Sequence, residues 1–167
     1  VYAIAAYHDT GLVNGRENHH LDAGRILAAD RTLRRWFSEE QIDTMREAVE
    51  DHRASSKHAP RSIYGRIVAE ADRLIDPATI IRRTVQYGLD HCPGLDREGH
   101  FVRCLEHLRE KYAEGGYLKL WIPESENARQ LEALREVIRD PELIRKAFDK
   151  AFDAETAKTP LPEPEKR

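Results

Sequence analysis

Residues 1–11, with the sequence VYAIAAYHDTG, are the stretch that decides the fold of this chain. A short apolar run delivers a His-Asp pair, His8 and Asp9, and a glycine follows almost at once. Neighbouring residues on a helix point about 100° apart, so the two side chains can converge only where the helix ends or its surroundings are concave. A buried pair of this kind suggests a metal site. A core histidine held by a carboxylate is the alternative explanation.

Further residues of the metal-binding type follow, each at the edge of a helical pattern: His20 in ENHHLDAGRIL, His52 in AVEDHRASS and Asp72 in AEADRLID. Histidine and carboxylate together suit first-row ions such as zinc, iron, manganese or nickel. Each residue also has a plainer explanation. His20 could be an exposed neighbour of a helix cap, His52 could face the negative end of a helix dipole, and Asp72 could form a surface ion pair with Arg73.

The order HD…H…H…D resembles the HD-domain superfamily of metal-dependent phosphohydrolases, whose signature is an early His, a His-Asp doublet and a distant Asp on separate helices. The resemblance covers roughly residues 1–75 and is carried by HDTG, by the HxxxG of residues 20–24, by DHR at 51–53 and by ADRLID at 71–76. In the family the first His lies at least a helix upstream of the doublet. We therefore expect a preceding segment that carries it, because Val1, Ile4 and Ala5 look like the middle of a buried helix without an N-cap.

The resemblance implies an all-α HD-domain helical bundle that hydrolyses a nucleotide or other small phosphate ester through a metal-activated water. The cofactors would be one or two divalent transition-metal ions, Mn, Fe, Ni or Zn. By the same resemblance Asp9 would bridge two ions. His8 and Asp72 would hold one ion together with the upstream His, and His20 and His52 would hold the other. Two nearby cations would lower the pKa of a bridging water and offset charge on the phosphoryl oxygens.

Basic residues gather in the loop after His52, where Arg53, Lys57 and Arg61 accompany Ser55 and Ser56. Arginine offers a bidentate fork to a phosphate and lysine a point charge, so such a loop beside a metal could hold the substrate. Arg53 and Lys57 are therefore the catalytic candidates besides Asp9, with a role in electrostatic stabilisation. A solvated loop between two helices would have a similar composition.

The composition favours a helical protein, with 40% hydrophobic residues, 34% charged residues, 9 Gly and 8 Pro among 167 residues. The net charge of −3 leaves no broad basic field for nucleic acid, so the expected partner is a small phosphorylated substrate. No apolar run approaches the roughly 20 residues that cross a bilayer, which argues against a membrane partner. Cys92 and Cys104 form no CxxC unit and are predicted to be free thiols, which favours a reducing, cytoplasmic location.

The periodicity predicts a single HD-type helical domain over residues 1–158, with a metal-site half at about 1–76 and a helical scaffold as a C-terminal extension at about 77–158. The helices are expected over residues 21–29, 32–37, 42–49, 62–75, 80–89, 101–113, 126–138 and 141–152. Ser38 and Gln41 form the pattern of a capping box, and Pro77 is suited to a first helical position after Asp76. The proline-rich, charged tail at 159–167 is predicted to be disordered.

Three other functions are compatible with the sequence. The first is a catalytically incomplete HD module that binds nucleotide or a protein partner without turnover, since fold does not fix function. The second is a di-iron HD-type oxygenase, against which the basic loop argues. The third is a purely structural bundle, which would leave the ordered ligand-type motifs unexplained.

Overall fold

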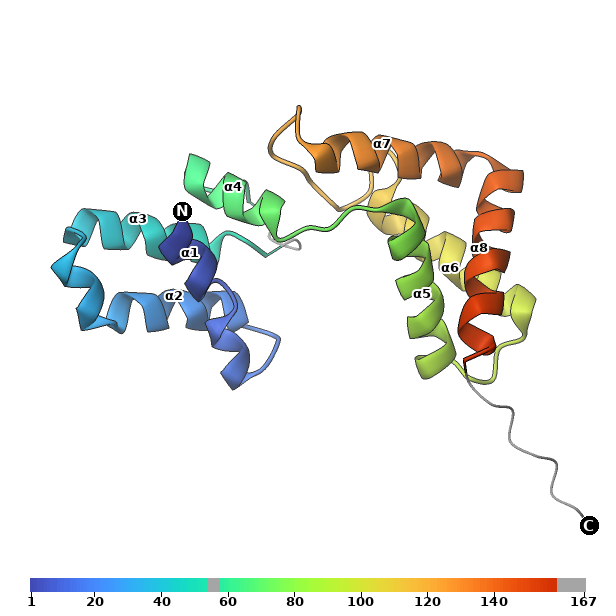
Figure 1. Cartoon of the computed structure of the whole chain (residues 1–167), viewed down its shortest axis with the longest axis horizontal. Helices are drawn as coiled ribbons and strands as arrows, with labels where there is room; N and C mark the ends of the chain where they lie inside the picture. The colour runs from blue at the N-terminus through green and yellow to red at the C-terminus, as the bar shows by residue number, and fades with distance from the viewer. Residues whose placement is uncertain (54–57, 159–167) are drawn as a thin grey trace, which may run out of the picture. The chain divides into compact units, whose positions relative to one another are not determined.

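The computed structural model describes residues 1–53 and 58–158, and within these ranges all regular structure is helical (Figure 1). This confirms the all-α prediction. The α-helices are α1 (Tyr2–Tyr7), α2 (His19–Ala29), α3 (Glu39–Glu50), α4 (Ile63–Ala71), α5 (Pro77–His91), α6 (Arg97–Tyr112), α7 (Glu126–Arg139) and α8 (Pro141–Thr156). Two short 3-10 helices, η1 (Thr10–Asn14) and η2 (Arg31–Arg35), follow α1 and α2. Lys57 and the tail at 159–167, both subjects of sequence predictions, lie outside the described residues.

The chain divides into two compact units. The first comprises Val1–Leu74 together with Leu118–Ser125, and the second comprises Ile75–Tyr117 together with Glu126–Arg167. The boundary falls close to residue 76, where the sequence analysis divides the metal-site half from the scaffold half. The segment Leu118–Ser125 differs from that division, because it follows α6 in the chain but belongs to the first unit.

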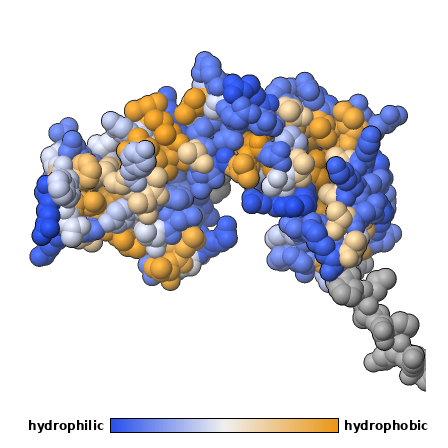
Figure 2. All heavy atoms as spheres, viewed as in Figure 1, coloured by the Kyte–Doolittle hydropathy of each residue, from blue (hydrophilic) through white to orange (hydrophobic). Residues whose placement is uncertain are grey.

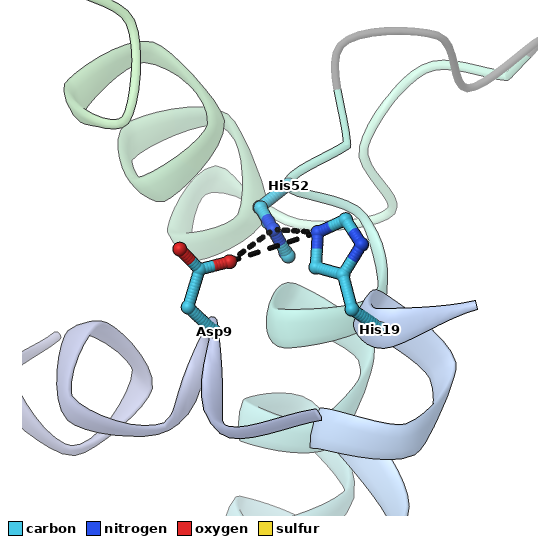
Figure 3. A group of neighbouring side chains, drawn as sticks. All are labelled: Asp9, His19 and His52. Carbon is cyan, nitrogen blue, oxygen red and sulfur yellow. Dashed lines mark hydrogen bonds and ion pairs between the residues drawn. The ribbon is translucent and has the colours of Figure 1, made fainter. Parts of the chain in front are cut away.

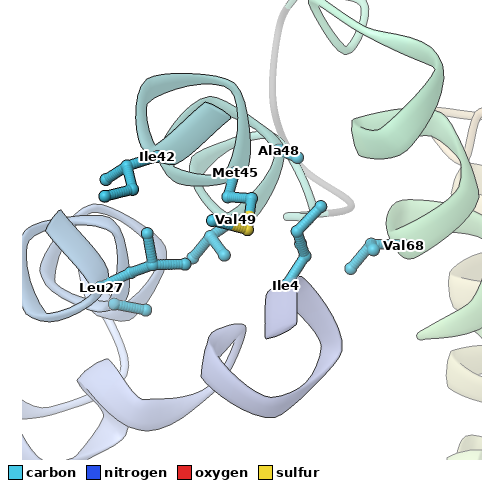
Figure 4. Packing of buried hydrophobic residues seen from close by; sticks show 8 residues of the cluster. Ile4, Leu27, Ile42, Met45, Ala48, Val49 and Val68 are labelled. Carbon is cyan, nitrogen blue, oxygen red and sulfur yellow. The ribbon is translucent and has the colours of Figure 1, made fainter. Parts of the chain in front are cut away.

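The core of the first unit is built where α1, α2, α3 and α4 pack together (Figure 4). Ile4 of α1, Leu27 of α2 and Val49 of α3 are at most 1% exposed. Full burial of such a side chain stabilises a fold by about 1.5–3 kcal/mol. Of the residues expected in a buried helix at the start of the chain, Ile4 is buried in the core, whereas Val1 and Ala5 are exposed. The burial of Ile4 fixes the position of the His-Asp doublet that follows it.

The helix ends follow local side-chain chemistry, as the sequence indicates. At α3 the Ser38 hydroxyl accepts a hydrogen bond from the Gln41 N–H, and the Gln41 side chain accepts one from the Ser38 N–H, at 3.3 and 3.0 Å. This confirms the predicted capping box. Asp76 caps α5, whose first residue is Pro77, as predicted.

Helix α4 is shorter than the predicted helix over residues 62–75. It ends at Ala71 with Asp72 as its C-cap, and the Arg73 N–H bonds to the Glu70 carbonyl at 3.2 Å in a tight turn. Val68 of this helix is buried, whereas Leu74, which lies beyond the helix end, is 63% exposed. The early end places Asp72 at a helix terminus instead of within a helix.

The second unit packs α5, α6, α7 and α8 around a core of its own, which includes Val85, Leu108, Leu134 and Phe148. Cys104 is buried in it, and both cysteines are free thiols, as predicted. On the face seen in Figure 2, hydrophilic side chains predominate and apolar ones gather in smaller areas. In the described parts of the chain, we find no helix with the length and apolar character needed to cross a membrane.

Candidate metal site

The His-Asp doublet lies where α1 gives way to η1. His8 is the C-cap of α1, and Asp9 is the N-cap of η1, so the chain turns between the two side chains. The doublet therefore lies at a helix end, one of the two settings in which the side chains of His8 and Asp9 can converge. As a result both side chains reach the same region of the first unit, where His8 is half-buried and Asp9 is exposed, so the pair is less buried than the sequence predicts.

The Asp9 carboxylate lies between two sets of side chains, one with His19 and His52 and the other with His8 and Asp72. Its Oδ1 atom is 3.6 Å from the Nε2 of His19 and 3.6 Å from the Nε2 of His52 (Figure 3). Its Oδ2 atom is 3.6 Å from the Nε2 of His8. One carboxylate oxygen therefore faces each set, an arrangement suited to bridging two cations.

Asp72 completes the second set. Its Oδ1 atom lies 3.4 Å from the Nε2 of His8, so His8 contacts both Asp9 and Asp72. Within the described residues, two groups of potential ligand atoms meet the spacing of a metal site, and they share Asp9: Asp9, His19 and His52 form one, and His8, Asp9 and Asp72 form the other.

The three histidines are oriented in the same way. The Nδ1 atoms of His8, His19 and His52 lie 2.7, 2.8 and 2.6 Å from the carbonyl oxygens of Ala5, Arg16 and Val49, three residues back in each case. A carbonyl oxygen only accepts, so each Nδ1 carries the hydrogen, and in a neutral imidazole each Nε2 would present a lone pair to the site. Backbone carbonyls commonly orient metal-binding histidines in this manner.

The donor set fits a divalent cation. The Nε2 atoms of His19 and His52 lie 3.2 Å apart, close to the roughly 3.3 Å between two nitrogens bound to one tetrahedral ion. Two lone pairs at this separation repel unless a proton or a cation lies between them. Burial lowers the pKa of His52, which favours the neutral imidazole that binds metals.

His19 takes the place that the sequence analysis gives to His20. His20 is in neither group, and its Nδ1 is a buried atom with no hydrogen-bond partner among the described residues. The phase of α2 explains the difference, because the buried residues Ala23, Gly24 and Leu27 follow His20 at intervals of three, four and seven. His20 thus lies on the face that packs against α3. These intervals become informative only once Ala23, Gly24 and Leu27 are known to be buried, so the sequence alone did not select His19.

Arg53, the other described catalytic candidate, is half-buried in the turn after His52. Its Nη1 donates to the carbonyl oxygen of Glu17 in the loop before α2. Burial first, and the nearby Arg53 guanidinium second, lower the pKa of His20. The side chain of Arg53 therefore reaches the loop just before α2.

Comparison with known protein families gives one result for this part of the chain: the model of the HD domain matches residues 1–75. No curated protein and no solved structure matches the chain.

Proposed function

Residues 1–75 belong to the HD-domain superfamily, and on that premise we propose that the chain is a metal-dependent phosphohydrolase. HD domains generally bind divalent metals and generally act as hydrolases. The proposed substrate is a nucleotide or another small phosphate ester. The proposed ions are one or two of Mn, Fe, Ni or Zn, in keeping with a donor set of imidazole and carboxylate.

The position of the Asp9 carboxylate carries the proposal. One oxygen faces His19 and His52, and the other faces His8, with Asp72 beside it. A histidine held for packing needs one acceptor, whereas three histidine Nε2 atoms here converge on one carboxylate. This convergence supports a centre for two cations that share Asp9.

In this proposal each residue of the site has its own role. Asp9 would contribute to both metal positions, His19 and His52 would hold one cation, and His8 and Asp72 would hold the other. When bound, two cations lower the pKa of a shared water and offset charge on the phosphoryl oxygens. The Arg53 guanidinium offsets further negative charge on the substrate, a role that the sequence also proposes for Lys57.

The first test is elemental analysis of the purified full chain after reconstitution with manganese, iron, nickel and zinc in turn. We expect one or two equivalents of metal in the parent and a loss in the variants His52→Ala and Asp72→Ala, each of which removes a ligand of a different group. His91→Ala is the control, because His91 is an exposed histidine that lies outside both groups. Parent and variants are then assayed with 4-nitrophenyl phosphate and bis(4-nitrophenyl) phosphate.

Each result has a definite meaning. Metal in the parent, lost in the two variants together with ester hydrolysis, supports the hydrolase. Metal without hydrolysis of any phosphate ester, nucleotides included, would favour a binding module. A parent that takes up no metal under any of the four conditions overturns the proposal.

A further inference from the structure

Asp51 is a buried carboxylate immediately before the candidate ligand His52. It is the C-cap of α3, and it is 2% exposed. A carboxylate in such a place is costly unless it is fully hydrogen-bonded and paired with a cation. The partner is Arg61, ten residues later in the chain.

Arg61 contacts Asp51 through both its main chain and its side chain. The Arg61 N–H donates to Asp51 Oδ2 at 2.7 Å, and the guanidinium Nε and Nη2 lie 3.1 and 2.9 Å from Oδ1. The same Nη2 donates to Glu50 Oε2 at 2.7 Å and to the Glu47 carbonyl at 3.1 Å. The end of α3 therefore binds Arg61, which directly precedes Ser62, the N-cap of α4.

Two close approaches extend this pair to the neighbouring helices. A Cβ atom at Gly65 of α4 would lie 3.4 Å from Asp51 Oδ2 and 3.1 Å from the Cβ of Pro60. A Cβ atom at Gly24 of α2 would lie 2.7 Å from the Cγ of Glu50. Both glycines let helix backbone lie directly against the acidic residues that hold Arg61. The contacts thus connect α2, α3 and α4.

These three helices carry ligands of both groups. His19 begins α2, His52 follows the end of α3, and Asp72 is the C-cap of α4. Asp51 and Arg61 also hold together the two ends of the segment that contains Arg53. A change at this ion pair is therefore expected to alter the spacing of the ligands.

We propose that Asp51 and Arg61 are positioning residues, whose ion pair sets the spacing between the two ligand groups. This rests on the proposed function of the site. Neither residue touches the ligand atoms of the two groups, so the pair acts through His52 and Asp72.

The experiment measures Co²⁺ binding to the chelator-treated full chain by calorimetry and visible absorption, well below the melting temperature of each variant. Asp51→Asn keeps the shape but removes the charge, and Arg61→Lys keeps the charge but removes the fork. The controls are Asp149→Asn and Arg97→Lys, which alter a more exposed Arg–Asp pair in the second unit, with Arg97 Nη2 2.9 Å from Asp149 Oδ1.

We expect Asp51→Asn and Arg61→Lys each to weaken Co²⁺ binding about 10- to 100-fold, the usual loss for a residue that orients ligands. The absorption band should change in shape, which a loss of stability alone would not cause. The double variant should be little worse than either single one, because both changes break one interaction. If Asp51→Asn is unfolded at the assay temperature, the Co²⁺ affinity of Arg61→Lys alone tests the positioning role.

The outcomes separate the two proposals. If the parent binds Co²⁺ and the variants of Asp51 and Arg61 bind it with parental affinity and absorption, the positioning role is overturned while the metal site stands. If all four variants lose affinity equally, the effect is one of general stability, and the positioning role is again overturned. A parent that binds no Co²⁺ and no other divalent ion overturns the proposed function itself.

Discussion

A Cβ atom at Gly11 would lie 2.0 Å from the main-chain carbonyl oxygen of His19. The 3-10 helix that follows the His-Asp doublet is thus packed directly on the first turn of α2. This contact brings Asp9 within 3.6 Å of the Nε2 of His19. The glycine of HDTG is therefore required by a close approach of two backbone segments.

Gly11→Ala should destabilise the first unit and separate Asp9 from His19. The added methyl meets backbone atoms, which cannot rotate away, so we expect at least the roughly 1–3 kcal/mol typical of overpacking. Thermal unfolding followed by circular dichroism measures the loss. The control is Gly94→Ala, because a Cβ there would meet no atom within 4 Å. Equal melting temperatures for the two variants would contradict the close approach.

His19→Ala should remove metal from the group that contains His52, and His20→Ala should leave it. The reason is geometric, because the Nε2 of His19 lies 3.2 Å from that of His52, whereas His20 belongs to neither ligand group. We expect His19→Ala to weaken binding of one equivalent by more than the 10- to 100-fold loss typical of an outer-shell residue. Calorimetric titration with Mn²⁺ gives the comparison. A larger loss in His20→Ala would restore the assignment made from the sequence.

The difference between His19 and His20 shows where sequence reasoning ends in this protein. Local patterns gave the capping box at Ser38 and the Asp76-Pro77 helix start, since both depend on residues within one turn. Choosing between two adjacent histidines needs the rotation of α2 about its axis. That rotation is set by packing against α3, which is a tertiary property.

The segment Leu118–Ser125 shows a second limit. The sequence places it within the scaffold half, but buried Glu70 of α4 accepts hydrogen bonds from the Trp121 N–H at 2.9 Å and from the Ser125 hydroxyl. The two partners are separated from Glu70 by more than 50 residues, and no local pattern reports such a pair.

Glu70→Ala should destabilise the first unit by about 1–3 kcal/mol, because it removes the buried carboxylate that accepts from the half-buried Trp121 N–H and Ser125 hydroxyl. Glu70→Gln should destabilise the first unit less, since its amide oxygen can still accept a hydrogen bond. Urea unfolding of the full chain measures both changes. Glu106→Ala is the control, because Glu106 is an exposed helical glutamate and such changes are usually within about 0.5 kcal/mol. An alanine variant as stable as this control would show that Glu70 does not hold the segment.

Cys104 should make the stability of the second unit fall between pH 9 and 11. Burial raises the pKa of its thiol from 9.0 to about 11. In this window the unfolded chain loses a proton that the folded chain keeps, so deprotonation favours unfolding and the stabilisation present below pH 9 is lost. Two pKa units correspond to about 3 kcal/mol as an upper bound.

Urea unfolding at several pH values measures the slope of the unfolding free energy against pH. Cys104→Ala should have a shallower slope than the parent and than Cys92→Ala, which alters a half-buried cysteine. Identical slopes in all three proteins would show that the Cys104 thiol titrates alike in the folded and unfolded chains.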